Sequence, residues 1–415
     1  MTLSHTTLNF LFSDTGRAAL DWLAAQDLSD TNTLPLLNTL RREYAPDDAG
    51  AALTMARLRQ RAAAKFSRAD QMFFTPDALE QASSEVISYT RISHFFQSSY
   101  LHIVDLGCGI GGDAIMLGSY PGAGVIAVDR DALRLRMARA NLAVYDRRWS
   151  HVVQADITDP LPLQRIRQRA GKEYKAAFFD PARRVESGGK KRRVFSVRDY
   201  VPPLDVIRQW DFEAMAVKLS PGVKLDELAP YIQDRARIEF VSLGGELKEA
   251  VLWYGLLGFG ENSATRVEAD GRVYALYRNP GAISVRLSAP RAYLYEPDPA
   301  LIRAGLFAEL KLELRQQIFL LDPQIAYLTA DSYVPSPWLR AWPVLAWLPF
   351  NLKRLRAALR ERNIGRVTVK KRGSPILPED LIRKLKLNGE GDAAVIVLTQ
   401  IADQHSAIIC GEMLG

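Results

Sequence analysis

The sequence predicts an α/β fold whose central part is a parallel sheet, with a helical region before it and small α+β units after it. Between about residues 100 and 260, short apolar runs alternate with helical segments, as in parallel sheets. Four of the first five runs carry an aspartate at or near their carboxyl end. A glycine-rich turn, residues 107–112, follows the first run. Because open α/β sheets bind ligands beyond the carboxyl ends of their strands, these features also predict where the site lies.

The composition indicates an ordinary globular protein of two to four domains. The 415 residues are 48% hydrophobic and 24% charged, with a net charge of +7. No apolar run reaches the roughly 18–20 residues that span a bilayer, and the N-terminus lacks a signal-peptide pattern. Two cysteines give no disulfide framework, and five scattered histidines give no metal-ligand spacing. We therefore expect a cytoplasmic protein with no metal and no membrane partner.

Residues 1–97 are expected to form an N-terminal helical region. Ser13 and Asp14 can cap a first helix, and Thr33 stands ahead of a second. Residues 47–66 are rich in helix-forming residues. Thr75 followed by Pro76 is a typical helix start and predicts one helix through residues 77–96.

Residues 98–262 carry the pattern of the parallel sheet. The expected strands are residues 101–105, 124–129, 151–156, 175–180, 213–220, 237–244 and 246–255. Only Gly244 and Gly245 separate the last two, too few residues for a crossover helix. These two strands should therefore form an antiparallel hairpin.

The remaining residues predict two smaller units. We expect a small α+β (ferredoxin-like) domain and linker at 263–345, with a hairpin centred on Asp270 and Gly271. The tryptophan-rich stretch 338–350 is interpreted as a linker or inter-domain packing surface. In the last unit, 346–415, strands are expected at 366–373, 393–400 and 406–411, with a helix at 377–387.

The glycine-rich turn allows two interpretations of the ligand. Gly107, Gly109 and Gly112 satisfy G-x-G-x-x-G, and Asp129 lies at the spacing that dinucleotide-binding folds use for a ribose-binding acid. Asp105, directly before the glycines, is less expected there because its carboxylate would repel a pyrophosphate. It suits a ligand with a positive end, such as the ammonium of a methionine moiety.

Four motifs in order resemble those of class I S-adenosylmethionine-dependent methyltransferases: VDLGCGIGGD, AVDRD, QADITD and FFDPARR. The resemblance implies a Rossmann-like sheet and S-adenosyl-L-methionine as cofactor. It implies that Asp105 holds the amino-acid end of the cofactor, Asp129 its ribose hydroxyls and Asp156 its adenine. The full set of expected cofactor-binding residues is Asp105, Gly107, Gly109, Gly111, Asp129, Asp156 and Ile157.

The fourth motif carries the expected catalytic residues Asp180, Pro181 and Arg183. Amino methyltransferases resembling this motif have a second proline and an aromatic residue where Ala182 and Arg183 stand here. Uridine-C5 methyltransferases need a nucleophilic cysteine, and the later strand end, VKLSPG, carries Ser220 instead. We therefore expect a nitrogen or oxygen acceptor that Asp180 orients, with Asp180 also a candidate base.

Two basic clusters predict a polyanionic substrate. Residues 183–198 contain seven basic residues and one acidic residue, and residues 364–390 contain seven and three. The C-terminal segment resembles the THUMP-like domain of a bacterial methyltransferase family, as does the N-terminal stretch 65–83. This resemblance implies an RNA substrate, tRNA or rRNA. The expected RNA-binding residues are Arg184, Lys190, Lys191, Arg192, Arg193, Lys370, Lys371 and Arg372.

Two alternatives stay open from the sequence. The altered fourth motif is compatible with a non-catalytic RNA-binding protein that retains the methyltransferase fold. The G-x-G-x-x-G match is compatible with an NAD-dependent oxidoreductase, although no proton-relay residue is evident.

Overall fold

The computed structural model describes residues 3–147, 149–159, 174–182, 184–187, 190–193 and 196–414, with the backbone alone for 184–187 and 190–193. The contacts between residues divide the chain into two compact units. The first runs to Ile238 and includes Glu249–Gly260, and the second comprises Glu239–Lys248 and Glu261–Gly415. The expected four-part division remains a prediction.

The first unit begins with a series of helices, as expected for the N-terminal region. They are α1 His5–Phe12, α2 Asp14–Ala24, α3 Thr33–Leu40, α4 Pro46–Ala62, α5 Pro76–Gln81 and α6 Glu85–Gln97. Ser13 caps α2 as expected, and Thr75 accepts the N–H of Ala78 to cap α5. The single helix expected after Thr75 is wrong: Ala82 and Ser84 have extended backbone, and α6 starts anew at Glu85.

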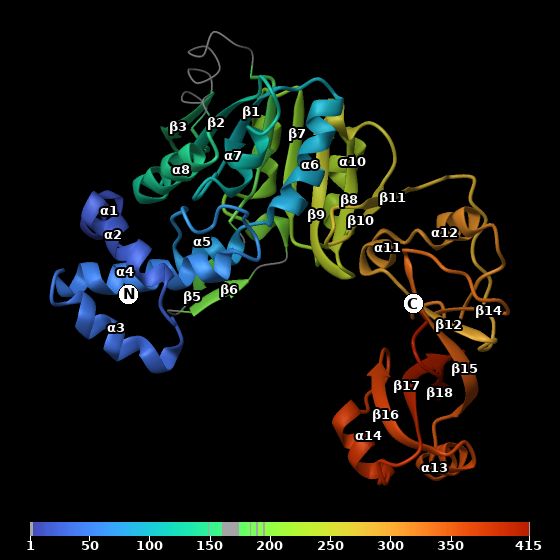
Figure 1. The fold of residues 1–415 in the computed structure, drawn as a ribbon. Helices are drawn as coiled ribbons and strands as arrows, with labels where there is room; N and C mark the ends of the chain where they lie inside the picture. Colours follow the sequence, from blue (N-terminus) through green and yellow to red (C-terminus); the bar gives the residue numbers. More distant parts are fainter. Residues whose placement is uncertain are drawn as a thin grey trace. The chain divides into compact units, whose positions relative to one another are not determined.

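The sheet of the first unit confirms the Rossmann-like prediction (Figure 1). Its elements are β1 His102–Leu106, α7 Gly112–Leu117, β2 Gly124–Asp129, α8 Ala132–Val144, β3 Ser150–Gln154, β4 Ala176–Phe179, β7 Ala214–Leu219, α10 Ala229–Gln233, β8 Ala236–Leu243 and β9 Glu246–Gly255. The strand order is β3-β2-β1-β4-β7-β9, followed by β8, most of whose residues belong to the second unit. Strands β3, β2, β1, β4 and β7 are parallel, and β9 is antiparallel to β7.

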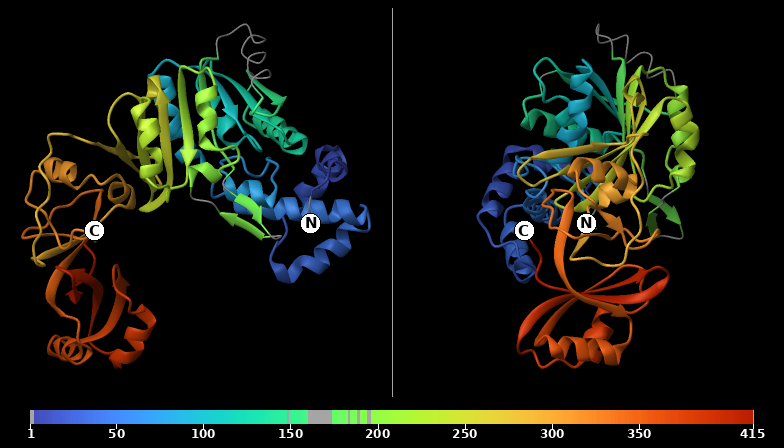
Figure 2. Two further views of the ribbon diagram at one scale, coloured as in Figure 1. Left: turned by 180° about the vertical axis from the view of Figure 1, so that it is seen from behind. Right: turned by 90° about the vertical axis from the view of Figure 1, so that its right-hand side faces the viewer.

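The parallel register brings the ends of β1, β2 and β4 to one edge. Asp105 on β1 pairs in register with Ala127 on β2 and Phe178 on β4. Every residue of β2, β4 and β7 is buried, as expected for strands covered on both faces. Helix α7 contacts β1, β2, α6 and α8 along one face, as Figures 1 and 2 show. The aspartates at these strand ends are therefore neighbours in space.

Two hairpins complete this part of the chain. The backbones of β5 Arg184–Ser187 and β6 Lys190–Arg193 pair antiparallel. In the second unit, β10 Ser263–Val267 and β11 Val273–Tyr277 pair antiparallel around Asp270 and Gly271, which confirms the expected hairpin. Strand β10 also pairs with β8 in parallel.

The C-terminal sheet has seven strands in the order β13-β14-β12-β15-β18-β17-β16. Its elements are β12 Tyr293–Pro297, α11 Pro299–Ala304, α12 Phe307–Leu314, β13 Phe319–Leu320, β14 Leu328–Ala330, β15 Leu339–Pro349, α13 Leu352–Glu361, β16 Ile364–Lys371, α14 Pro378–Leu385, β17 Asp392–Ile401 and β18 Gln404–Cys410. The right-hand view of Figure 2 shows these strands, orange to red, twisting strongly.

The tryptophan-rich stretch is not a linker. It forms β15, which pairs antiparallel with β12 on one side and with β18 on the other. The two prolines within this stretch, Pro343 and Pro349, have no backbone N–H to donate to a neighbouring strand. The carbonyl of Pro343 still accepts the N–H of Gly411. A register shift between Val344 and Ala346 accommodates the irregularity.

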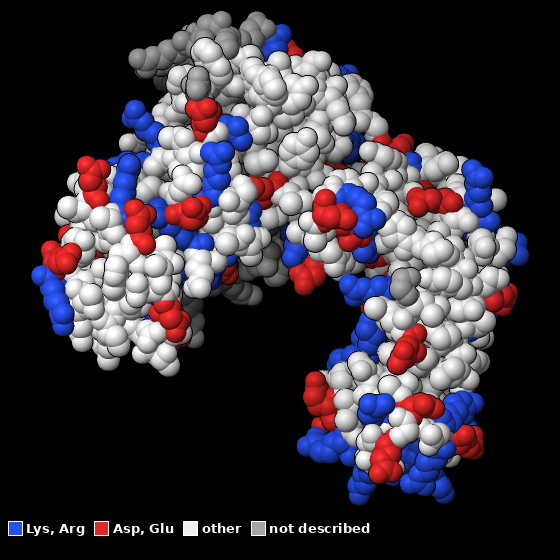
Figure 3. Space-filling model, viewed as in Figure 1, with Lys and Arg blue, Asp and Glu red and all other residues white. Residues whose placement is uncertain are grey.

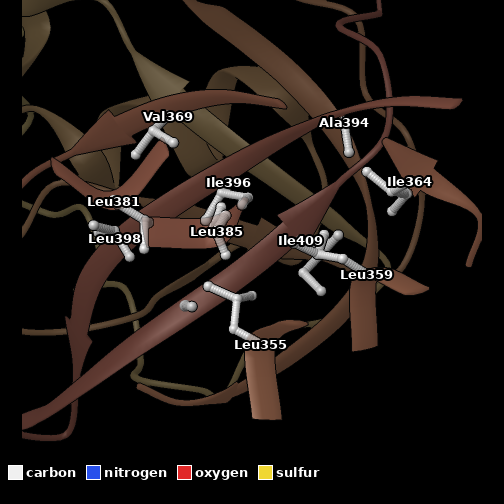
Figure 4. Packing of buried hydrophobic residues seen from close by; sticks show 11 residues of the cluster. Leu355, Leu359, Ile364, Val369, Leu381, Leu385, Ala394, Ile396, Leu398 and Ile409 are labelled. Atoms are coloured by element: carbon white, nitrogen blue, oxygen red, sulfur yellow. The ribbon is translucent and has the colours of Figure 1, made fainter. Parts of the chain in front are cut away.

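Helices α13 and α14 cover one face of this sheet through an apolar core. Leu355 and Leu359 of α13 and Leu381 and Leu385 of α14 are buried in it. Figure 4 shows these leucines with the strand residues that complete the cluster, among them Ile396 and Ile409. The faces of α13 and α14 that point away from this core are exposed to solvent.

Candidate active site

The glycine-rich turn between β1 and α7 adopts a backbone that favours glycine. Gly107, Gly109 and Gly111 have φ of 79°, 56° and 82°. A Cβ on Gly111 would lie 3.3 Å from the Cα of Ala138, whereas a Cβ on Gly109 would meet nothing within 4 Å. Gly111 is thus packed against α8, and Gly109 faces open space where a ligand can approach the backbone.

Asp129 fixes this turn to the end of β2. Its Oδ2 accepts the Gly109 N–H at 2.9 Å and its Oδ1 accepts the Asp131 N–H at 2.9 Å. Asp131 in turn caps α8. Because a carboxylate has about four lone-pair sites, Asp129 can still accept from ribose hydroxyls beside these amides.

Asp105 is a buried carboxyl with an unsatisfied oxygen. It is 1% exposed, and its Oδ2 has no hydrogen-bond partner among the described residues. Burial, reinforced by the charges of Asp113 and Asp180, raises the pKa of Asp105 well above its usual value. An ammonium group placed here would satisfy the free oxygen and favour the ionised carboxylate. This residue therefore fits the positive end of a methionine moiety.

Asp180 follows β4 and is held by a lysine that the sequence analysis missed. Lys218 on β7 donates from its Nζ to Asp180 Oδ2 at 2.6 Å. The lysine side chain is 5% exposed and the aspartate side chain 22% exposed. Pro181, next in the chain, is buried, and Arg183 lies outside the described residues. The carboxylate is thus on the solvent side of the pair and the cation behind it.

A second missed residue, Arg91 of α6, lies at the centre of a buried charge cluster. Its Nε donates to Glu249 Oε1 at 3.0 Å, its Nη1 to Asp113 Oδ1 at 3.0 Å and its Nη2 to Ser83 Oγ at 3.2 Å. Its guanidinium also stacks over the ring of Phe178. Burial lowers the pKa of Arg91, but the carboxylates of Asp113 and Glu249 outweigh this and raise it overall.

The chain between α5 and α6 lies against this cluster. A Cβ on Gly112, at the start of α7, would contact the ring of Phe66 at 3.4 Å and Ala82 Cβ at 3.8 Å. The Gln81 carbonyl lies 3.5 Å from Lys218 Nζ. The N-terminal helical region therefore contributes one wall beside the glycine-rich turn.

Asp156 and Ile157 follow β3 in an exposed turn. Asp156 Oδ1 accepts both the Thr158 hydroxyl at 2.7 Å and the Thr158 N–H at 2.9 Å. These two hydrogen bonds lower the pKa of Asp156. The Ile157 carbonyl accepts the Trp210 indole N–H at 3.1 Å. These contacts fix both residues in the turn that follows the carboxyl end of β3.

The structure therefore brings Asp105, Gly107, Gly109, Asp129 and Asp180 to one edge of the first unit's sheet. The side chains of Arg184 and of residues 190–193 lie outside what is described.

The second basic cluster, in the other unit, is partly engaged within the fold. Lys370 pairs with Glu296 at 2.6 Å and lies over the ring of Trp342, and Arg372 pairs with Glu296 at 3.5 Å. Lys371 is exposed.

The missed residues had weak sequence signals. Lys218 and Glu249 are charged residues inside apolar strands, AMAVKL and ELKEAVLWYG, and such residues are rarely buried without a partner. Arg91 had no such signal, because an arginine on a helix is usually solvated.

The described residues form neither a metal site nor a membrane-spanning helix. No group of three or more histidine, cysteine, aspartate or glutamate side chains there is arranged to hold a metal. Within the same ranges, none of the helices is both long and apolar enough to cross a bilayer.

Comparison with known proteins identifies the family. Residues 339–412 match the family described as THUMP domain-like, and residues 4–62 match a domain of unknown function, DUF8688. A Mycobacterium tuberculosis protein, found in two strains and named an uncharacterized S-adenosylmethionine-dependent methyltransferase, is 31% identical over 348 residues. The match covers 82% of this chain and 90% of that protein. The chain belongs to this methyltransferase family.

A solved structure extends the comparison over the whole fold. The crystal structure of a Porphyromonas gingivalis W83 protein matches 99% of each chain with a TM-score of 0.73 at 21% identity. This methyltransferase therefore shares its complete architecture with that protein.

Family membership also decides between the two interpretations of the turn. The cofactor of this methyltransferase is S-adenosyl-L-methionine, and the unsatisfied Asp105 oxygen agrees with a cofactor that has a positive end. NAD-dependent oxidation is not its activity.

Proposed function

We propose that this methyltransferase modifies a nitrogen or oxygen atom of an RNA nucleotide, in tRNA or rRNA. The single observation that supports an RNA substrate best is a basic surface on the THUMP-like part of the chain. Five exposed cations on or directly after α13 and α14 have no ion pair among the described residues: Lys353, Arg354, Arg360, Lys384 and Lys386. Figure 3 shows many blue side chains, with red ones among them, over the part of the chain that holds these two helices. We call these five residues the basic helix surface.

The basic helix surface suits a phosphate backbone. Buried leucines occupy the inner sides of α13 and α14, so the charged side chains are on the outer sides. Lysine and arginine on one face neutralise phosphates and release counterions, which gives salt-dependent affinity without base specificity. We also propose that the protein acts in the cytoplasm, as expected from the sequence.

The proposed roles at the sheet edge follow from the contacts there. Asp105 would hold the ammonium of the cofactor, Gly107 and Gly109 would lie against it, and Asp129 would accept its ribose hydroxyls. When bound, S-adenosyl-L-methionine supplies an electrophilic methyl group. Asp180 would accept a hydrogen bond from the N–H or O–H of the acceptor and so orient its lone pair, an effect of alignment rather than covalent catalysis.

Radiolabelled methyl transfer tests the proposal. Purified protein is incubated with tritiated S-adenosyl-L-methionine and RNA from cells that lack this protein, with RNA from wild-type cells as the saturated control. The proposal predicts label in RNA from the deletion cells and little in the control. Label that appears in added protein but not in RNA would contradict it.

A further inference from the structure

The ion pair between Lys218 and Asp180 has an inner and an outer member. Lys218 is on the fifth parallel strand, beside β4, and its ammonium is almost fully buried. Asp180 is partly exposed at the carboxyl end of β4, where the acceptor would arrive. The lysine therefore contacts the carboxylate from the side opposite the solvent.

The buried ammonium of Lys218 needs interactions that offset its loss of water, because removing an ammonium from water costs several kcal/mol before any pairing. Its 2.6 Å contact with Asp180 Oδ2 recovers part of that cost. The second contact, 3.5 Å to the Gln81 carbonyl, connects it to the segment after α5. Lys218 is thus held between the N-terminal wall and the catalytic edge.

We propose that Lys218 is a positioning residue that orients Asp180 toward the acceptor and fixes the segment at Gln81 beside it. This inference rests on the proposed function in giving Asp180 to the acceptor. Lys218 itself is too deeply buried to meet a nucleotide. Its effect therefore passes through Asp180, and it changes turnover rather than cofactor affinity.

The surrounding charges support this orientation. Asp180 is near Asp105 and Arg91 as well as Lys218, and Arg91 is already occupied by Asp113 and Glu249. Lys218 donates a described hydrogen bond to Asp180, and Asp105 and Glu249 are acids close enough to repel the Asp180 carboxylate.

The test compares Lys218→Met, Lys218→Gln, Asp180→Asn and the double variant Lys218→Met/Asp180→Asn, with Lys224→Met as control. Lys224 is an exposed lysine in the loop after β7. Each protein is assayed with tritiated S-adenosyl-L-methionine on the RNA, protein and small-molecule fractions of an extract from deletion cells. Affinity for S-adenosylhomocysteine is measured by calorimetry.

We expect Lys218→Met to lower kcat about 100-fold, the scale of a small misplacement of an orienting group. S-adenosylhomocysteine affinity should change less than about threefold, and Lys224→Met should behave as wild type. Lys218→Gln, which keeps a neutral donor, should retain more activity than Lys218→Met. If Lys218→Met fails to bind S-adenosylhomocysteine, Lys218→Gln is compared with wild type instead. We then expect kcat of Lys218→Gln to be about tenfold lower than that of wild type. The double variant should be no slower than Asp180→Asn alone, because both changes remove the same effect.

Each outcome separates this inference from the proposed function. Wild-type kcat in the Lys218 variants, or losses that multiply in the double variant, would overturn the positioning role. Label in the protein or small-molecule fraction alone would overturn the RNA proposal, while the kcat ratios would still decide on Lys218. A wild-type protein that labels none of the fractions overturns both.

Discussion

The backbone N–H of Gly109 donates a 2.9 Å hydrogen bond to Asp129 Oδ2. This bond joins the glycine-rich turn after β1 to the carboxyl end of β2, so the first two sequence motifs form one rigid unit. Gly109 also has a left-handed backbone and open space beside its Cα. In the proposed cofactor site, the cofactor occupies this space.

Replacing Gly109 by alanine should therefore weaken cofactor binding in addition to lowering the stability of the fold. A left-handed alanine costs about 1–2 kcal/mol, and the added methyl group would meet the ligand rather than the protein. We expect affinity for S-adenosylhomocysteine to fall at least about tenfold in calorimetry. Gly122→Ala is the matched control, since Gly122 has φ of 80° and also nothing within 4 Å. Equal loss of affinity in both variants would contradict this assignment.

Cofactor binding should strengthen as pH rises. The pKa of Asp105 is raised by burial and by Asp113 and Asp180, so the ligand-free protein holds this proton to higher pH than an ordinary carboxyl, and the ammonium of the cofactor favours its loss. Calorimetry over a pH series, in buffers of different ionisation enthalpy, should show proton release on binding at pH values above the usual range of an aspartate. Asp105→Asn should bind more weakly and without this release. Release that persists in Asp105→Asn would assign the proton to another group.

Asp105 should favour cofactor binding at the expense of the stability of the ligand-free protein. Because its folded pKa lies above its unfolded value, the folded protein binds this proton more tightly than the unfolded chain. The stabilisation that this proton gives to the folded protein is therefore present at low pH, and it is lost as the pH rises through the pKa of Asp105 in the folded state. At neutral pH, Asp105→Asn should unfold at a temperature equal to or a few degrees above wild type. A large fall in the unfolding temperature would show that Asp105 is mainly structural.

Removing Arg91 should destabilise the first unit strongly. Arg91→Met leaves Asp113 and Glu249 without their main buried cation, and breaking a buried pair costs about 3–5 kcal/mol. Urea unfolding measures the loss. Arg91→Met/Glu249→Met removes one stranded charge as well and should recover part of the stability. A double variant less stable than Arg91→Met would contradict the pairing.

Charge reversal on the basic helix surface should weaken RNA binding. We expect Lys353→Glu/Arg354→Glu/Arg360→Glu to lower affinity at moderate salt and to reduce the slope of log affinity against log salt by about 2–3. The control is Arg17→Glu/Arg41→Glu/Arg42→Glu, an equal change of charge at exposed arginines of the N-terminal helices. An equal effect in both variants would mean that total charge, not this surface, governs binding.

The sequence was informative where a function depends on local chain geometry. Glycines before a helix, and aspartates at the ends of apolar runs, identify the turn and its acids because strand and turn periodicity place them at one edge. Lys218 and Arg91 could not be placed in this way. Their partners lie 38 residues away at Asp180 and 158 residues away at Glu249. Such pairings depend on which strands and helices become neighbours.

The C-terminal unit shows the same limit. A run of basic residues predicted an RNA-binding turn, but Lys370 and Arg372 pair with Glu296, which is 74 residues from Lys370. The exposed cations of α13 and α14 were counted only in part, because burial of Leu355 and Leu359 decides which side of the helix faces solvent. Charge counts in the sequence therefore do not show which cations the fold engages in ion pairs and which it leaves exposed.

We propose that this methyltransferase modifies RNA with Asp180 at its catalytic edge. Mass spectrometry of nucleosides from purified tRNA and rRNA tests it most directly, in deletion cells complemented with wild-type protein or with Asp180→Asn. We predict one methylated nucleoside that is missing in deletion cells, restored by wild type and not restored by Asp180→Asn at equal protein level. Identical nucleoside profiles in all three strains would contradict the claim.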